Sequence, residues 1–470
     1  MSSTALYNWS TAGYLVSLAI FAFHVVNTRR LLLRAGVLLV ALSFLVQTLG
    51  MVFRWVEAGF LEVTAAEKAV GQHLSGWSWF VVFTQHPPWS NLYEIMIYMS
   101  WGIIIVTLAC ELKWQLAWVR QVGIILALMA LGMAALNDAT IKPLVPALKS
   151  WWIMIHVISA SIAYASGALA AFICLFALMK DGVRVKDEAL IGYGLLFMAI
   201  LLFALGGGYH LLTDHAYYVK LLAHAGDSVV NVVDMTKEKS ASYLVPMPGV
   251  GVMIEAFVLI HVACGSVLLF RSRRPGNASA YIRSAMLLCF LSVMTLALVM
   301  LFHDMRATPV TVFGGIAHHL APVGPWFISF KSHPWSFGLV ILAVLIEGVL
   351  LLHLFWPRFF TERLPDVSAL EGAAYKAISL SFFLMTVVLI TGALWAHYAW
   401  GRYWAWDPKE TGALSIWITY AIYLHARRTA GLAGPFASVI GVCGFFVIIV
   451  GFLGVNLGLF ADGLHTYGNS

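Results

Sequence analysis

The sequence predicts an all-α fold, a polytopic bundle of transmembrane helices. Of its 470 residues, 61% are hydrophobic and 11% are charged, whereas a soluble domain is about half apolar and about a quarter charged. Apolar stretches of about 20 residues recur along the chain, each long enough to cross a hydrocarbon core of about 30 Å as a helix. Because lipid offers no partners to backbone amides, we expect every span to be helical.

Apolar runs bounded by charged residues, Pro or Gly predict about twelve spans. Their centres lie near residues 20, 42, 102, 127, 165, 201, 260, 292, 346, 386, 420 and 447. An even number of spans places both termini on the same side of the membrane. The first span follows no basic segment and precedes no small-residue cleavage site, so we expect that helix itself to direct insertion.

Basic residues in alternate loops predict the orientation. One set of loops holds the majority of the 28 Lys and Arg residues, among them Arg29, Arg30, Arg34, Lys180, Arg271, Arg273, Arg274, Arg283, Arg427 and Arg428. Such loops stay in the cytoplasm, so both termini are expected on the outer, periplasmic side of a bacterial inner membrane. The net charge of +6 then reflects topology and gives no reason to expect nucleic acid.

Three longer loops are expected on the outer side, at residues 54–92, 213–247 and 304–335. Long loops in a compact protein tend to carry function or cover a site. The five cysteines lie in or at the ends of apolar spans, and no two form a C-x-x-C pair: Cys110, Cys174, Cys264, Cys289 and Cys443. This pattern argues against a disulfide framework, a zinc site or a thioredoxin-like role.

A tryptophan-rich segment lies on the expected outer face between the tenth and eleventh spans. It reads W-A-H-Y-A-W-G-R-Y-W-A-W-D-P-K-E-T over residues 395–411. An aromatic belt at the membrane interface would account for two or three of these aromatics, but not for their interleaving with Gly401, Arg402 and Asp407. Rigid aromatics beside a few polar groups are the usual lining of a small-molecule site. We therefore expect residues 400–410 to form a surface loop that holds a flat aromatic ligand such as haem.

The pattern W-G-x-x-W-x-W-D-P-K-E-T, followed by W-x-x-Y-A-x-Y-L-H, resembles the tryptophan-rich WWD signature of the CcsA (ResC) cytochrome c biogenesis proteins, which handle haem. Three further segments are similar to motifs of that family: S-N-L-Y-E at 90–94 with S-W-G at 100–102, P-A-L-K-S…H-V at 146–157, and G-L-H-T-Y-G at 463–468. The resemblance covers roughly residues 1–180 and 370–470. Family members have about eight spans, which implies an N-terminal haem-handling core at 1–180, about four inserted spans with outer loops at 181–370, and a C-terminal core at 371–470.

The resemblance implies axial ligands for haem b. Matched by motif, His156 and His465 would bind the iron on the outer side, and His425 would belong to a second site within the membrane. The expected topology agrees, because it places the first two near outer helix ends and the third near an inner end. A lone histidine at a helix end is more often a headgroup contact, and the neighbouring Arg427 and Arg428 could make His425 part of a cytoplasmic cap.

The loop itself would contribute the surface for the ligand. Trp400, Trp404, Trp406 and Asp407 match the signature, and His397 is expected to support a propionate or the loop. Arg402 and Lys409 could pair with haem propionates, or equally with Asp407 and Glu410 inside the loop.

The implied function is cytochrome c maturation by a membrane subunit of a system II holocytochrome c synthase, or haem lyase. The chain would bring haem to the outer face and present it to the C-x-x-C-H motif of apocytochrome c. The resemblance also implies a CcsB/ResB-like membrane partner and thiol-reducing proteins. The extra spans could replace part of that partner, with His24 or His353 as the missing intramembrane ligand.

Two other functions stay open. A b-type electron carrier or quinone-linked subunit would hold haem between histidines deep in the membrane, where only His261 is clearly placed. A transporter could use the aromatic loop as a gate. His318, His319 and His333 share an outer loop, but their spacing matches no defined metal site.

Overall fold

The protein is described from a computed structural model. The structure describes residues 2–456 apart from residues 88, 90, 115–116, 138, 142–143, 145–148, 182–185, 207–208, 226–227, 236–240, 273–278, 307, 311–318, 323–324, 330–333 and 429–433. The chain forms two compact units. Unit 1 comprises Met1–Lys180 with Leu364–Ser470, and unit 2 comprises Asp181–Arg363. These boundaries lie close to the segment limits expected from the sequence, although the roles assigned to the segments stay predictions.

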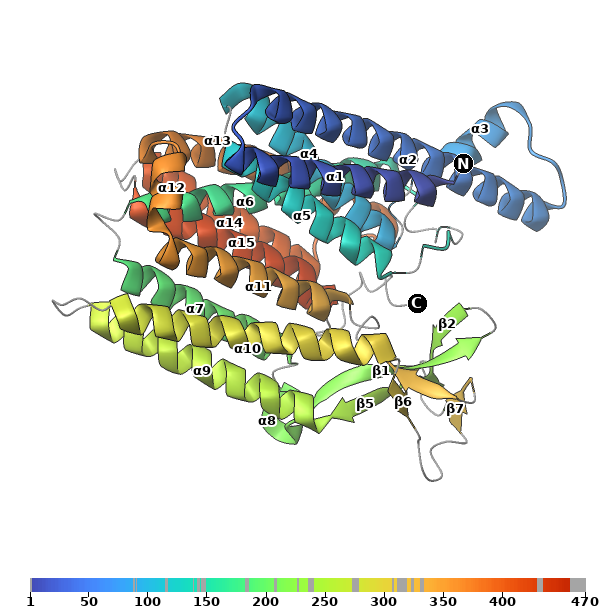
Figure 1. The fold of residues 1–470 in the computed structure, drawn as a ribbon. Helices are drawn as coiled ribbons and strands as arrows, with labels where there is room; N and C mark the ends of the chain where they lie inside the picture. The colour runs from blue at the N-terminus through green and yellow to red at the C-terminus, as the bar shows by residue number, and fades with distance from the viewer. Residues whose placement is uncertain are drawn as a thin grey trace. The chain divides into compact units, whose positions relative to one another are not determined.

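Unit 1 is helical, and its long helices lie side by side (Figure 1). They are α1 (Ser3–Val26), α2 (Arg30–Val70), α3 (Gly76–Thr84), α4 (Leu92–Trp114), α5 (Ala117–Ala135), α6 (Trp151–Lys180), α13 (Val367–Trp400), α14 (Pro408–Arg428) and α15 (Pro435–Asn456). The N-terminal and C-terminal parts of the chain therefore build one bundle.

The α6–α13 pair forms the centre of this bundle. Most of α6 is buried, and small residues bring the two backbones together. Ser166 donates a hydrogen bond to the carbonyl of Ala377 over 2.8 Å, and Ser381 donates one to the carbonyl of Ala163 over 2.7 Å. Small and hydroxyl-bearing residues are typical of helix contacts in lipid, where close packing and interhelical hydrogen bonds replace the hydrophobic effect.

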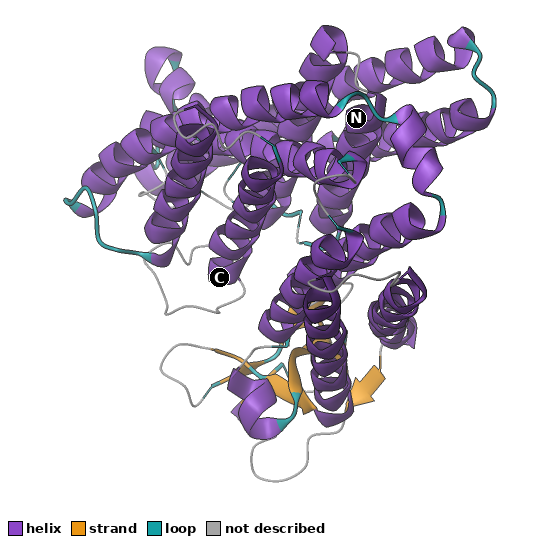
Figure 2. Ribbon diagram, turned by 90° about the vertical axis from the view of Figure 1, so that its left-hand side faces the viewer, coloured by secondary structure: helices purple, strands orange, loops and turns teal. Residues whose placement is uncertain are grey.

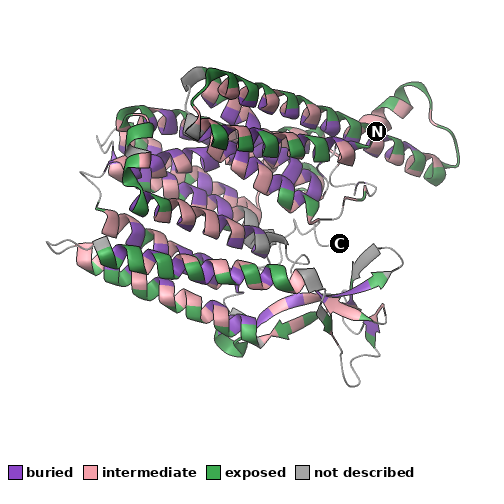
Figure 3. Ribbon diagram, viewed as in Figure 1, coloured by how far each residue is buried: buried purple, intermediate pink, exposed green. Residues whose placement is uncertain are grey.

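The α2 helix has an apolar outer face. Leu38, Leu42, Leu45 and Leu49 recur at helical spacing and are all exposed, whereas Gly36, Val40, Ser43 and Gln47 face the bundle. Figure 3 shows exposed residues running along α1 and α2. A helix that turns leucines outward and polar groups inward is typical of a protein surrounded by hydrocarbon.

The expected outer loop 54–92 is largely helical, which corrects that part of the sequence analysis. The α2 helix continues to Val70, so its 41 residues extend about 60 Å, twice the hydrocarbon thickness. The short helix α3 then packs back on α2, with the ring of Phe83 against Gly59. The expected loop began at residue 54, but Arg54 pairs with Glu94 and Glu57 accepts a hydrogen bond from Ser3, so the helix continues past both charges.

Unit 2 contains helices and two small sheets. Its helices are α7 (Asp187–Leu205), α8 (Tyr209–Asp214), α9 (Pro248–Ser272), α10 (Ser279–Arg306), α11 (Pro334–Phe355) and α12 (Pro357–Arg363). Its strands are β1 (Tyr217–Ala225), β2 (Ser228–Asn231), β3 (Val233–Asp234), β4 (Ala241–Ser242), β5 (Leu244–Met247), β6 (Thr308–Val310), β7 (Leu320–Ala321) and β8 (Trp326–Ile328).

The strands come from the other two expected loops, 213–247 and 304–335, which pair with each other. One sheet has the order β2-β1-β8-β6, with β5 also paired to β1, and the other has the order β4-β3-β7. All pairs are antiparallel, for example Leu222 opposite Phe327. Figure 2 shows the strands gathered at one end of the unit's helices. These strands could not be predicted from the sequence, because they are short and hold together only through pairing between distant segments.

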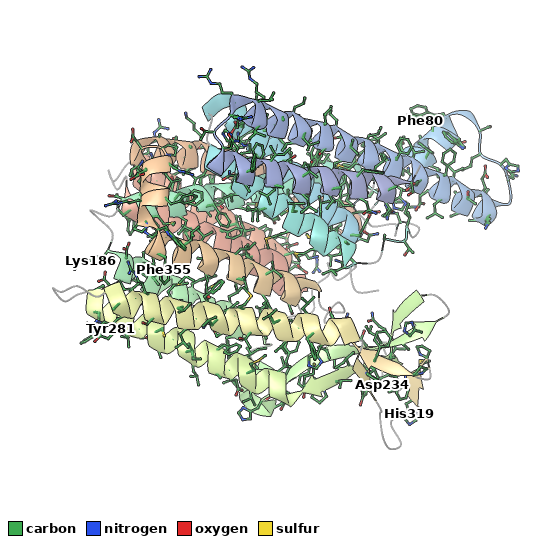
Figure 4. All side chains as sticks on the ribbon, in the orientation of Figure 1. Phe80, Lys186, Asp234, Tyr281, His319 and Phe355 are labelled. Atoms are coloured by element: carbon green, nitrogen blue, oxygen red, sulfur yellow. The ribbon has the colours of Figure 1, made fainter. Side chains whose placement is uncertain are left out.

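The prediction of a polytopic helical membrane protein is confirmed. Each of the twelve expected span centres falls within a helix, and among the described residues eight helices are long and apolar enough to cross a membrane. In unit 2, Lys186 and Tyr281 lie at one end of the helices, while Asp234 and His319 lie in the strand region at the other (Figure 4). This separation agrees with the expected sidedness; the orientation itself stays a prediction.

Candidate functional site

His156 lies in the second turn of α6 and faces α13. Its Nδ1 atom is 2.9 Å from the carbonyl oxygen of Val388. Because a carbonyl only accepts, Nδ1 carries the hydrogen and the imidazole lone pair is on Nε2. A histidine that binds a metal nearly always donates its other ring N–H in this way, which fixes its tautomer and orientation.

Gly392 makes room for this ring. A Cβ atom at Gly392 would lie 2.9 Å from both Cε1 and Nδ1 of His156, closer than carbon and nitrogen atoms pack. On the next turn of α13, the ring of Trp395 lies 6.5 Å from the imidazole, centroid to centroid, at 30°. The imidazole is therefore held between a backbone acceptor, a glycine niche and a buried indole.

Trp395 connects His156 to the tryptophan-rich loop. Its ring meets that of Trp400 edge to face at 4.8 Å, a favourable arrangement for aromatic pairs. Only 3% of Trp395 is exposed, so it supports the cluster from below. Of the residues predicted for the site, the structure thus brings His156 and Trp400 into one cluster, and Trp395 is the residue between them that the prediction did not single out.

The loop between α13 and α14 has two left-handed positions. Gly401 ends α13 with φ 73°, which glycine adopts without cost. Trp406 has φ 58°, a conformation that costs a side chain about 1–2 kcal/mol. Its indole is 71% exposed and meets Trp404 edge to face at 5.6 Å. A strained backbone that turns a large aromatic outward is a feature of binding sites.

The D-P-K-E segment caps α14. Asp407 Oδ1 accepts the backbone N–H of Lys409 over 2.9 Å, and Glu410 Oε2 accepts the N–H groups of Ala405 and Asp407. With Pro408 in the first helical position, Asp407 is the N-cap, and Glu410 accepts its N–H as the third helical residue does in a capping box. Both carboxylates thus accept backbone N–H groups, and Asp407 also interacts electrostatically with the ammonium group of Lys409. Arg402 is exposed and forms no ion pair within the part of the chain that the structure describes.

His397 supports the loop. Its imidazole stacks on the ring of Tyr403 at 4.2 Å with an angle of 8° between the planes. Both side chains are exposed on the same stretch as Trp406. The expected role of His397 toward a propionate or the loop stays a prediction.

His425 lies in the last turn of α14 and is exposed. Arg427, two residues further, turns toward α13, where it lies 3.9 Å from a carboxylate oxygen of Glu371 and over the ring of Tyr375. Residues two apart point to opposite sides of a helix, so His425 faces away from α13. Arg427 is thus part of the helix packing, and His425 is accessible to a ligand or partner outside the bundle.

His465, the expected second outer ligand, lies outside the described residues, as do His318 and His333. His24 is half-buried in the last turn of α1. His353 is 4% exposed, and its Nε2 lies 3.6 Å from a carboxylate oxygen of Asp187. A role for either histidine as an intramembrane ligand stays a prediction.

The S-N-L-Y-E motif builds structure at the start of α4. Asn91 accepts the N–H of Glu94 over 2.9 Å as a helix cap. Glu94 in turn accepts a hydrogen bond from Arg54 over 2.9 Å, and both side chains are almost fully buried. Arg54 also donates to the carbonyl of Ala139 over 2.7 Å. The motif thus holds α4, the extended part of α2 and the segment after α5 together.

A second buried polar group continues this cluster. Glu62 accepts a hydrogen bond from Lys149 over 2.8 Å and one from the backbone of Leu144. The Nδ1 atom of His86 lies 3.0 Å from Glu62 Oε1. His86 is fully buried, and this burial lowers its pKa, while the carboxylates of Glu62 and Glu94 act in the opposite direction.

His261 does not fit the b-type alternative. Its Nδ1 atom lies 2.7 Å from the carbonyl of Phe257, and its Nε2 atom lies 2.8 Å from Glu347 Oε1. Both ring nitrogens are therefore engaged with protein groups. The one histidine that the sequence placed deep in the membrane is not arranged to bind iron.

Comparisons with known proteins give the family. A family model described as "Cytochrome C assembly protein" matches residues 89–220 and 253–460. The chain belongs to this family. The cytochrome c biogenesis protein CcsA of a Picosynechococcus species is 29% identical over 390 residues, which cover 81% of this chain and 80% of the relative. CcsA of a Nostoc species is 28% identical over 446 residues, 91% of this chain and 95% of the relative. CcsA of Prochlorococcus marinus is 52% identical over 103 residues, 22% of this chain and 32% of the relative.

The resemblance drawn from the motifs is thus confirmed, and the protein has a role in cytochrome c maturation as a CcsA-type member of the family. The matched ranges reach into residues 181–363, so part of the middle block is shared with the relatives that align there. That other members have about eight spans without this block stays a prediction.

Proposed function

We propose that the chain binds haem b on the outer face of the bacterial inner membrane and presents it for covalent attachment to apocytochrome c. The observation that carries this proposal is the arrangement of His156. Its imidazole is fixed by Val388, seated against Gly392 and flanked by Trp395, which in turn contacts Trp400 of the WWD loop. An oriented imidazole beside an aromatic platform suits an iron porphyrin.

The loop would hold the porphyrin while leaving one edge open. The exposed indole of Trp406 would stack on the macrocycle, with the half-buried indole of Trp404 supporting it edge to face. The exposed Arg402 would bind a propionate. His465 would supply the second axial ligand on this side. His425, accessible near the other end of α14, would belong to an intramembrane site that a CcsB/ResB-like partner completes with a histidine of its own.

The chemistry asked of this chain is positioning. Each attachment adds a cysteine S–H across a vinyl C=C of the haem: one S–C bond and one C–H bond form, and no electrons are gained or lost. Holding the vinyl edge and the C-x-x-C-H thiols together converts a bimolecular addition into a local one. Thiol-reducing proteins would keep the two cysteines as thiols, and the chain would act as the membrane subunit of a haem lyase.

Haem content and cytochrome c yield test this proposal. We would co-express the chain with a reporter cytochrome c, with and without a CcsB/ResB-like partner, in cells that lack their own maturation system. The wild type should purify with haem, and His156→Ala should lose most of the haem and of the reporter. His73→Ala is the matched control, because this side chain is 97% exposed on the segment after α2.

The proposal fails if the purified wild type shows no haem absorption, or if His156→Ala keeps both haem and reporter yield. Haem that persists in His156→Ala while the reporter disappears would also contradict ligation by His156. Added imidazole should restore part of the haem in His156→Ala, because it fills the space of the missing ring.

A further inference from the structure

Unit 2 has a fully buried histidine–carboxylate pair in the middle of its membrane spans. His261 lies near the centre of the span Gly249–Ser272 of α9, and Glu347 near the centre of Gly338–Phe355 of α11. Both side chains are 0% exposed. At 1.5 Å per residue, each group is about 12–20 Å from the ends of its helix. Ionisable groups at this depth are costly and are kept for function or for a specific partner.

The hydrogen bonds of His261 fix how many protons the pair holds. The carbonyl of Phe257, 2.7 Å from Nδ1, can only accept, so Nδ1 carries a hydrogen. The contact of 2.8 Å between Nε2 and Glu347 Oε1 then contains one further proton. That proton is either on the imidazole, giving an ion pair, or on the carboxyl group, giving two neutral partners. In both cases the pair is neutral as a whole.

The surroundings favour the form in which each partner is neutral, with the proton on the carboxyl group of Glu347. The other oxygen of Glu347, Oε2, is buried without a hydrogen-bond partner among the described residues. A carboxylate would place negative charge on this oxygen with no donor near it, and burying both ions costs several kcal/mol for each. A carboxylic acid has no such requirement, because Oε1–H donates to Nε2 and Oε2 is an ordinary carbonyl oxygen.

Among the described residues, two thiols are the nearby titratable groups. Cys289 on α10 interacts with Glu347 and with Cys264, which lies one turn along α9 from His261, and both cysteines are free thiols. The other carboxylate of α9, Glu255, is at the end near the strands and pairs with the exposed His215 over 2.9 Å. No cation among the described residues pairs with Glu347 other than His261 itself.

We propose that His261 and Glu347 form an intramembrane proton-binding site, with Glu347 as a carboxylic acid that donates its exchangeable proton to His261. The inference rests on the span positions and hydrogen bonds of unit 2 and does not depend on haem. Transfer of the proton from Oε1 to Nε2 moves it between two partners without changing the net charge in the membrane. Release of the proton to another acceptor leaves a buried anion, so the site holds one proton and gives it up only when a path to an acceptor opens.

Infrared spectroscopy of the purified full chain in lipid nanodiscs tests the proposal. The wild type should show the C=O stretch of a protonated carboxyl group at neutral pH, and this band should move on transfer to D2O. Glu347→Gln should remove the band. Glu255→Gln, the matched control on α9, should leave it in place. His261→Leu should keep the band but shift it to higher frequency, because the acid loses its strong acceptor.

Two results would overturn the proposal. They are a wild-type spectrum without the band, and a band that survives Glu347→Gln. If Glu347→Gln does not fold, the wild type with isotope-labelled glutamate assigns the band to a glutamate, and its shift to higher frequency in His261→Leu assigns it to the partner of His261. Because the measurement needs neither haem nor a client protein, its outcome is independent of the haem-presentation proposal.

Discussion

The Nδ1 atom of His156 lies 2.9 Å from the carbonyl oxygen of Val388, and this contact joins the two central helices of unit 1 at the candidate site. The acceptor is a backbone group, so its position depends on the path of α13 and not on the identity of the side chain at 388. The tautomer of the imidazole is therefore fixed by helix packing.

Gly392→Ala is expected to displace the imidazole of His156. The new Cβ atom would lie 2.9 Å from two ring atoms, so the ring must rotate or the helices must separate. Haem recovered with the purified protein should fall severalfold, and absorption spectroscopy measures it. Gly372→Ala is the control on the same helix, because no atom lies within 4 Å of a Cβ there. Equal haem in the two variants would show that the niche at Gly392 has no role in ligation.

Trp406→Gly is expected to separate stability from binding. Glycine removes the cost of about 1–2 kcal/mol of a left-handed side-chain position, so the midpoint of thermal unfolding should stay or rise. The exposed indole is lost as well, so haem content should fall. Trp406→Ala removes the indole but keeps the backbone cost, so it should bind as poorly and unfold earlier than Trp406→Gly. A stable, haem-replete Trp406→Gly variant would exclude this indole from the platform.

Asp407→Ala is expected to destabilise the start of α14 by about 1 kcal/mol, the usual effect of losing a helix cap. Asp407→Asn keeps an oxygen acceptor for the N–H of Lys409 and should be close to wild type in stability. Unfolding in detergent by a chemical denaturant measures both. If Asp407→Asn keeps stability and loses haem, the negative charge has a function in binding beyond the cap.

The buried His86 is expected to make unit 1 less stable in acid. Burial lowers the pKa of His86 in the folded chain below the ordinary 6.5. Between this lowered pKa and 6.5, the unfolded chain binds a proton that the folded chain does not. The free energy of unfolding therefore falls as the pH falls below about 6.5 and rises again toward neutral pH. The groups facing the ring are the carboxylates of Glu62 and Glu94 and the ammonium group of Lys149.

The difference between wild type and His86→Gln isolates this contribution. Thermal unfolding measured across the same pH range should give a smaller loss of stability in acid for His86→Gln than for wild type. His73→Gln, at an exposed histidine of the same outer segment, should follow the wild type. Parallel curves for wild type and His86→Gln would contradict the assignment of a lowered pKa to His86.

The candidate site could be predicted only in part. The match of residue types and spacing to the family motifs was enough to single out Trp400, Asp407 and His156 as candidates. Gly392 and Val388 gave no such signal, because a glycine or an aliphatic residue inside an apolar span is compatible with any helix contact. The capping role of Glu410 is visible in the spacing D-x-x-E. Whether Arg402 and Lys409 pair with haem propionates or inside the loop stays a prediction.

The sequence alone determined the helical membrane fold, since apolar runs of the right length leave the backbone no alternative in lipid. It also determined the family, because the WWD signature depends on residue types and spacing. Only the tertiary structure decided which distant segments contact each other. The strands of 213–247 and 304–335 form by pairing with one another. The α2 helix continues beyond Arg54 because Glu94 neutralises that charge, and the WWD loop lies next to His156 because α6 and α13 pack through small residues. Each depends on contacts between residues far apart in the chain, which local pattern cannot encode.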